Sequence, residues 1–282
     1  MIKKILPLSY VIFSALFVVS CGGEDKSAEA STATDVETTN DTVKSEVRIN
    51  FDLVRVNVPS PGELSKKLKA AKINYNKSTL LSSSKAGSFS SNYQKAIGLG
   101  AFGADLAISA AYNQPQDALD YLSQMGKLAG DIGISSAFDP EFSKQLISNI
   151  NKPDTFQLML DKAFDKAERN LRSNQRVASA VLLVAGGWVA SLYVSVEGLN
   201  TNPKGDSTKT LYSDISVHCH AFEYVFELLD AYKSNADCAK LIKELEPSKD
   251  MLVSVGRNPK IGPDELPKIR EAVAALRSKV IG

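Results

Sequence analysis

The stretch VASAVLLVAGGWVASLYVSV, residues 177–196, decides the fold because it holds twenty consecutive residues without a charge. An apolar stretch of roughly 20 residues is long enough to cross a bilayer as a helix. Three serines, the pair Gly186 and Gly187, and Tyr193 interrupt it, and a separate signal near the N-terminus predicts a lipid anchor. We therefore expect a central helix that other helices cover on all sides.

A second stretch rich in small residues is AIGLGAFGADLA, residues 96–107, in which Gly98-x-Gly100-x-x-Gly103 spells the fingerprint of a dinucleotide-binding turn. That turn needs a buried strand before it and an acidic residue about 20 positions after it. Polar residues 90–95 precede the glycines, and Ser123 stands where the acid is needed. The stretch therefore predicts a helix over 91–112 and no nucleotide site.

Small residues share one face of this expected helix, including Gly100 and Gly103. A glycine inside a helix costs about 1 kcal/mol relative to alanine, so close packing must offset the loss. The uncharged stretch offers small positions in return, at Ala185, Gly186 and Gly187. We expect the two helices to touch at these residues.

Apolar residues recur at helical spacing along the rest of the chain and predict about nine helices and no sheet. Caps and prolines place these helices at about 61–72, 91–112, 118–132, 139–150, 153–171, 177–196, 208–233, 237–246 and 263–280. Apolar and polar residues alternate from Ile49 to Val58, which predicts an extended arm over 48–58. The expected fold class is all-α, as an antiparallel helical bundle or a short stack of helix pairs.

The N-terminus predicts a lipoprotein. A charged start at residues 1–4 precedes an uncharged run over 5–20, as in a secretory signal. Val18-Val19-Ser20-Cys21 resembles the lipobox of bacterial lipoproteins, which implies that Cys21 is acylated and that acyl chains attach the protein to the membrane. The next residue, Gly22, is not an aspartate, which by the same resemblance implies sorting to the outer membrane.

Three segments follow from these patterns. Residues 1–20 are the expected signal peptide, and residues 21–47 are an expected disordered tether because they hold few large apolar side chains. Residues 48–282 are expected to form a single helical domain. The whole chain has 33 lysines and arginines and 32 aspartates and glutamates, so its charge does not favour a nucleic-acid partner.

Three residues stand out as a speculative ligand or packing site. Asp105 is the only charged residue between Lys95 and Asp117, and a carboxylate on an apolar helix either finds a partner or shifts its pKa. Trp188 and Tyr193 lie in the uncharged stretch and could line a pocket. The alternatives are a structural ion pair or solvent-facing position for Asp105 and core packing for the two aromatic residues.

His218-Cys219-His220 holds both histidines of the chain and, with Cys238, raises the question of a metal site. Residues two apart on a helix point about 200° from each other, so the histidines cannot share a metal ion. The two cysteines lie at very different distances from the expected turn near residue 235. We expect no metal, no cofactor and no disulfide between these cysteines.

Carboxylates cluster in the expected helix over 153–171, at Asp161, Asp165 and Glu168, among several lysines and arginines. Ion pairs at i,i+4 spacing account for them. The chain has no lipase-type G-x-S-x-G motif and no paired Cys–His arrangement, so the sequence predicts no catalytic residues.

The stretches IGLGAFGADLAISAAY and VLLVAGGWVASLY, with the proline-flanked start at Val58-Pro59-Ser60-Pro61, resemble a group of uncharacterised Bacteroidota lipoproteins. Many members of that group have an acid just after the tryptophan-containing run, where this chain has Ala190. The resemblance covers roughly residues 58–200. It implies an all-helical outer-membrane lipoprotein and no particular activity.

The leading expectation for function is a non-enzymatic interaction or accessory module, attached through Cys21 to the outer membrane and facing the periplasm or the cell surface, with envelope proteins as its partners. The alternative is a binding protein for a small apolar or amphipathic ligand, held near Trp188 and Asp105. A pocket of several hundred cubic ångströms beside Trp188, with Asp105 at its edge, would favour the alternative. A tightly filled core and an exposed apolar patch would favour a protein partner.

Overall fold

Helix α7 (Val177–Asn200) runs through the middle of the structure, a computed structural model that describes residues 51–54, 56–258 and 260–282. The other α-helices are α2 (Pro61–Ala70), α3 (Asn92–Ala111), α4 (Pro115–Asp131), α5 (Pro140–Ser148), α6 (Pro153–Ser173), α8 (Lys209–Asp230), α9 (Ala236–Leu245), α10 (Lys249–Gly256) and α11 (Leu266–Val280). The described residues contain no strand. The expected all-α fold is therefore confirmed.

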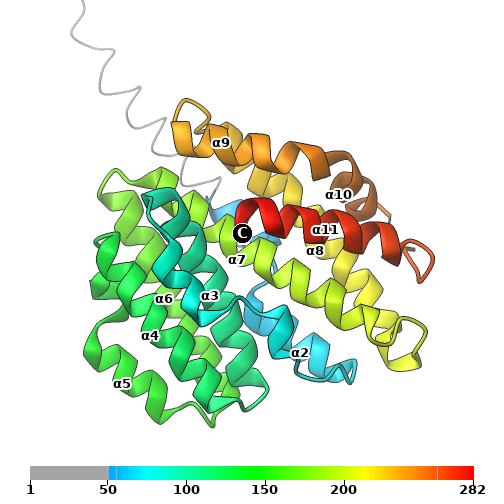
Figure 1. Ribbon diagram of the computed structural model, residues 1–282, viewed down its shortest axis with the longest axis horizontal. Coiled ribbons are helices and arrows are strands. Elements are labelled where there is room, and N and C mark those ends of the chain that lie inside the picture. Colours follow the sequence, from blue (N-terminus) through cyan, green and yellow to red (C-terminus); the bar gives the residue numbers. More distant parts are fainter. Residues whose placement is uncertain (1–50, 55, 259) are drawn as a thin grey trace, which may run out of the picture. The chain divides into compact units, whose positions relative to one another are not determined.

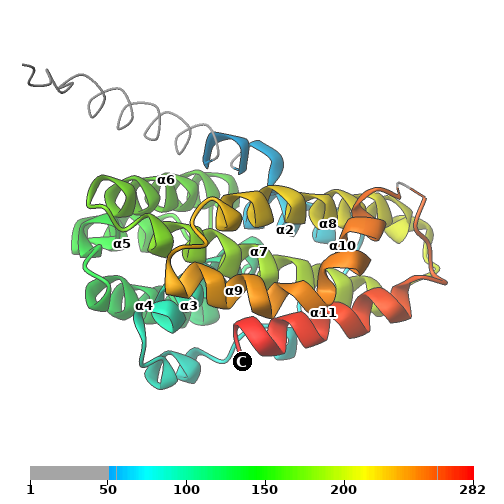
Figure 2. The ribbon, with the colours of Figure 1, turned by 90° about the horizontal axis from the view of Figure 1, so that it is seen from above.

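Two groups of helices share α7 (Figures 1 and 2). Helices α3 and α6 of the first group contact it on one side, and α8, α9 and α11 of the second group contact it on the other. Helix α2 contacts α3, α7 and α8. Although α7 is long and apolar enough to cross a membrane, 67% of its most apolar window is buried by the rest of the structure. Burial of a helix that is apolar all round accounts for its composition.

Local sequence signals set most helix starts. Ser60 and Glu63 form a reciprocal capping box at α2, with Pro61 at its first position. At α5 the carboxylate of Asp139 accepts a hydrogen bond from the N–H of Phe142 at 2.8 Å. Prolines also stand at the starts of α4 and α6, where their missing N–H costs nothing.

The extended arm is a wrong prediction. Residues 51–54 and 56–57 are helical, and the N–H of Val58 donates to the carbonyl of Val54 at 2.8 Å. Phe51 and Val54 are each 3% exposed, whereas Val56 is 82% exposed. Buried residues three apart indicate a helical face, and no strand is available among the described residues to satisfy an extended backbone.

The chain after Pro247 also differs from expectation. Residues Glu246–Ser248 form a 3-10 turn, and the unexpected helix α10 follows directly. The last helix begins at Leu266 rather than near Pro263. The predicted signal peptide, the tether and Cys21 lie outside the described residues.

Candidate functional site

A cavity of about 850 Å³ lies between residues 51–61 and helices α2, α3, α6, α7 and α8. Small-molecule sites occupy roughly 300–1,000 Å³ and are mostly apolar with a few polar groups. Apolar side chains of the lining include Phe51, Phe164, Leu183 and Trp188. Both the size and the lining therefore suit a small ligand.

Close packing of α3 on α7 forms one wall of this cavity. A β-carbon on Gly100 would lie 1.9 Å from the carbonyl oxygen of Leu183, and one on Gly186 would lie 2.1 Å from that of Ile97. The two helices are thus in contact at their backbones. Gly100, Ala104 and Gly187 line the cavity beside this contact.

Gly103 does not serve the contact with α7, contrary to expectation. A β-carbon at this position would lie 1.9 Å from Cζ of Phe164, which belongs to α6. Gly103 therefore allows the Phe164 ring to pack directly against α3. That ring forms part of the apolar lining of the cavity.

Trp188 is fixed in the cavity wall by two hydrogen bonds with His218 of α8. The indole Nε1–H donates to the carbonyl of His218 at 3.0 Å, and Nε2 of His218 lies 3.2 Å from the carbonyl of Trp188. A carbonyl only accepts, so Nε2 carries the proton. Burial lowers the pKa of His218 to about 4, which keeps the ring neutral at pH 7. The pair locks α7 to α8 and orients the indole.

The histidines and cysteines are separated by their surroundings. His218 is buried, whereas His220 is half-exposed, with Nδ1 3.6 Å from Oε2 of Glu223. Cys219 and Cys238 are both buried and free. Within the described part of the chain, no group of three or more His, Cys, Asp or Glu side chains is placed to hold a metal ion.

The segment before α2 forms the rim of the cavity. Phe51 packs beneath the guanidinium of Arg172, whose carbon atom lies 4.8 Å from the ring centre. Arg172 also donates to Glu168, one turn earlier on α6, at 2.6 Å. Val56 lines the cavity and is 82% exposed. Val217 of α8 also lines it and is 49% exposed. These two apolar side chains of the lining are therefore open to solvent.

One face of α6 adds carboxylates to the lining. Asp161, Asp165 and Glu168 stand at i, i+4 and i+7, a spacing that places them on one side of a helix. The expected i,i+4 pairs are present for Glu168 with Arg172 and, at 3.9 Å, for Asp165 with Arg169. Asp161 has no such pair and accepts a hydrogen bond from Gln157 at 2.6 Å.

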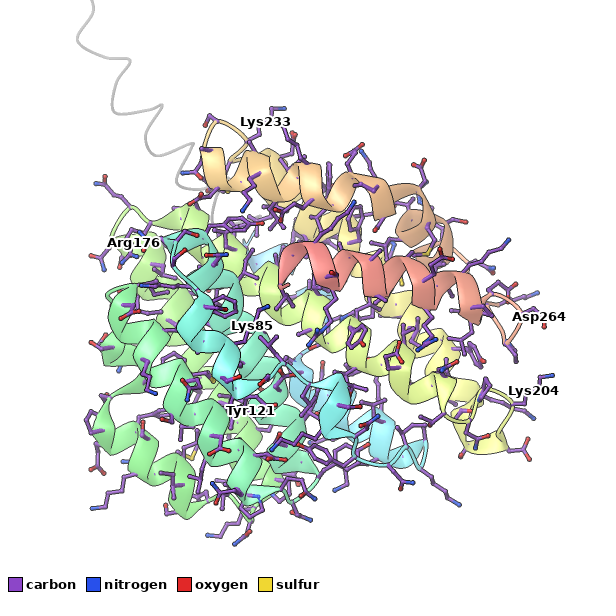
Figure 3. The ribbon with its side chains drawn as sticks, in the orientation of Figure 1. Lys85, Tyr121, Arg176, Lys204, Lys233 and Asp264 are labelled. Atoms are coloured by element: carbon purple, nitrogen blue, oxygen red, sulfur yellow. The ribbon has the colours of Figure 1, made fainter. Side chains whose placement is uncertain are left out.

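Asp105 lies away from the cavity. It is 1% exposed, and its Oδ2 accepts a hydrogen bond from the N–H of Leu81 at 2.8 Å. The hydroxyl of Tyr121, labelled in Figure 3, donates a hydrogen bond to the carbonyl of Leu81 at 2.9 Å. Burial raises the pKa of Asp105 to about 7, and the bond from Leu81 and the charge of Arg277 oppose the shift. Asp105 thus ties the loop before α3 to the core.

The three residues expected at one ligand site are therefore not brought together there. The ring of Tyr193 lies 4.6 Å from the guanidinium carbon of Arg277, on α11, and does not line the cavity. Only Trp188 lines it. The sequence predicted that the carboxylates of α6 form i,i+4 ion pairs. In the structure Asp161 does not form such a pair and accepts a hydrogen bond from Gln157 instead.

No known protein family matches the chain, and no curated protein or solved structure matches it closely enough to indicate a relationship. The geometry of the cavity is thus the basis for assigning a function.

Proposed function

We propose that this protein binds a small apolar or amphipathic molecule in the cavity between α2, α3, α6, α7 and α8, and that it does so at the bacterial outer membrane. The observation that carries the proposal is the cavity itself, about 850 Å³ in volume and lined by Trp188, Phe164 and Leu183.

The proposed lipid anchor would keep the cavity close to a membrane. Phe51, at the rim, stands thirty residues after Cys21. Thirty residues span at most about 100 Å when fully extended. Molecules that partition into membranes would therefore be concentrated within reach of the cavity, which supports an apolar or amphipathic ligand.

A role as an interaction module is the second candidate. Large apolar side chains are exposed at Val56 on the rim and at Leu158 on α6, the latter 55% exposed. Scattered exposed apolar residues are common on protein surfaces, so they carry less weight than a formed cavity.

Recovery of the native ligand tests the proposal. The full-length protein would be isolated from its own membranes and extracted with organic solvent for mass spectrometry, beside two variants. Val184→Phe places a ring at a half-buried lining position, and Val253→Phe makes the same change at a half-buried position on α10 outside the lining. We expect one small molecule with the wild type and Val253→Phe, and its loss with Val184→Phe. A ligand that Val184→Phe retains would place binding elsewhere.

A further inference from the structure

Exposed apolar side chains gather where the cavity opens to solvent. Of the five large apolar side chains that the described residues expose, Val56 and Val217 line the cavity, and Leu53 lies one turn before Val56. The other two, Ile147 of α5 and Leu158 of α6, do not line it. Leu53, Val56 and Val217 thus form one feature, the mouth of the cavity, and differ from the scattered apolar residues of an ordinary surface.

The segment over 51–57 is apolar on both of its sides. Phe51 and Val54 are buried, whereas Leu53 and Val56 are exposed and, three residues apart, share one face of the turn. Nδ2 of Asn57 donates to the carbonyl of Leu53 at 2.8 Å across this turn. In Figure 2 the segment, drawn in blue, lies at the upper edge of the described structure beside α6. A helix that is apolar all round is normally covered, and no described residue covers the outward face of this one.

The composition of the mouth favours hydrocarbon over a protein partner. Its three residues are all aliphatic, and such side chains enter the core of a bilayer without losing a hydrogen bond. Protein interfaces owe most of their affinity to Trp, Tyr and Arg, and leucine and valine are under-represented among their dominant residues. A lipid surface is therefore the better match.

The proposed lipid anchor is connected to this same part of the structure. Phe51 lines the cavity and is the first described residue, thirty positions after Cys21. No other described residue is closer to the anchor along the chain. Acylation of Cys21 would therefore keep the mouth near the bilayer at a high effective concentration, where even weak apolar contact is enough to dock it.

We propose, building on the proposed function, that Leu53, Val56 and Val217 dock on the lipid bilayer and set the mouth of the cavity against the membrane. An apolar face that lies in a membrane interface sits about 5–10 Å deep, at the boundary between head groups and acyl chains. The ligand would then pass between hydrocarbon and cavity without crossing water. Aliphatic contact has no charge for salt to screen, so docking should persist from about 0.1 M to about 1 M salt.

Fluorescent labelling of single positions tests the contact in the full-length protein. Cys219 and Cys238 are buried, so a thiol-reactive fluorophore selects the new thiol in Val56→Cys, Val217→Cys or Ile147→Cys. The Ile147→Cys protein is the matched control, because Ile147 is 43% exposed, close to the 49% of Val217, and lies outside the lining.

Each labelled protein would be placed in phosphatidylcholine vesicles with and without a nitroxide on the lipid acyl chains, which quenches fluorophores that enter hydrocarbon. We expect the labels of Val56→Cys and Val217→Cys to lose about half of their fluorescence at the depth of an interfacial face. The label of Ile147→Cys should lose little.

A charge placed in the mouth should weaken the docking. Val56→Asp, added to the Val217→Cys protein, should remove most of the quenching at position 217, because a carboxylate does not enter hydrocarbon readily. Ile147→Asp in the same protein should leave the quenching unchanged. Val56 is 82% exposed, so its replacement leaves the core intact.

Equal quenching of the three labels, or none at Val56→Cys or at Val217→Cys, would overturn the docking surface and leave ligand binding standing. Quenching confined to the mouth, with no ligand extracted from the wild type, would leave the docking surface and overturn ligand binding. Labels shielded in native membranes but not in vesicles would assign the mouth to a protein partner and overturn the bilayer contact. A full-length protein that does not associate with vesicles would overturn both the anchor and the docking.

Discussion

Gly100 of α3 lies so close to Leu183 of α7 that a β-carbon on the glycine would stand 1.9 Å from the leucine carbonyl oxygen. The neighbouring atom is backbone, so it cannot move aside as the tip of a flexible side chain can. The same holds for Gly186 against the carbonyl of Ile97. These contacts fix the spacing of α3 and α7, and with it the wall of the cavity.

Gly100→Ala should destabilise the protein. Forcing two backbones apart costs about 1–3 kcal/mol, which outweighs the gain of about 1 kcal/mol in helix propensity. Gly126→Ala is the matched control, because a β-carbon there meets nothing within 4 Å on α4, and it should stabilise. The free energy of unfolding from urea titrations measures both. A Gly100→Ala protein as stable as the control would contradict the close contact.

Asp105→Asn should remove a pH dependence of stability. The pKa of Asp105 is raised to about 7 in the folded state, so its contribution is complete below about 4, the unfolded value, and is lost as the pH rises through 7. Asparagine keeps an oxygen for the Leu81 N–H and does not ionise. The free energy of unfolding, measured by urea titration at several pH values, should increase for the variant relative to the wild type between pH 4 and 7. Parallel curves would count against a buried ionisable Asp105.

His218→Gln should act in the opposite direction. The pKa of His218 falls to about 4 on burial, so protonation of the unfolded chain destabilises the fold as the pH drops below about 6.5. Glutamine keeps an N–H donor for the carbonyl of Trp188 and binds no proton. The free energy of unfolding of the variant should therefore increase relative to that of the wild type as the pH falls from 6.5 to 4. The contributions of Asp105 and His218 to the free energy of unfolding change with pH in opposite directions, so they offset each other in the wild type over this range.

Cys219 and Cys238 should be unreactive in the native protein. Both are buried, and burial raises the pKa of Cys219 to about 12 and that of Cys238 to about 11. A thiol-specific chromogenic reagent at pH 8 should label neither until the protein is unfolded, because the thiolate is the reactive form. Rapid labelling under native conditions would show that the core around these residues opens.

Cys21→Ser should release the protein from membranes. An acylated cysteine has no free thiol, so the membrane-bound wild type, once denatured, should show two reactive thiols of the three cysteines in the chain. Fractionation of cells and a thiol count of the denatured protein check both parts. A serine variant that still fractionates with membranes would refute the anchor.

Sequence periodicity was sufficient for the helices that bury a clear apolar face behind a strong cap. Ser60 with Glu63, and Asp139 before Pro140, marked the starts of α2 and α5 correctly. The segment over 51–57 was misread because Phe51 and Leu53, and after a slip in phase Val54 and Val56, fit an alternating pattern. Tertiary contact with Arg172 chooses between them, and a residue so distant in sequence gives no local signal.

The cavity could not be derived from the sequence at all. Its walls come from the segment over 51–61 and five helices that meet only in the folded chain. Trp188 was identified because it is a single large aromatic residue in an uncharged stretch. Asp161 was not, because its neighbours Lys162 and Lys166 made ion pairing the simpler interpretation.

The central place of α7 also has a consequence for how the protein is made. Helices α3 and α6 leave the ribosome before α7, and the apolar faces that they pack against it stay uncovered until that helix arrives. Segments that expose apolar surface while they wait are prone to aggregate. A chain that ends before residue 177 therefore leaves the faces of α3 and α6 that contact α7 without their partner.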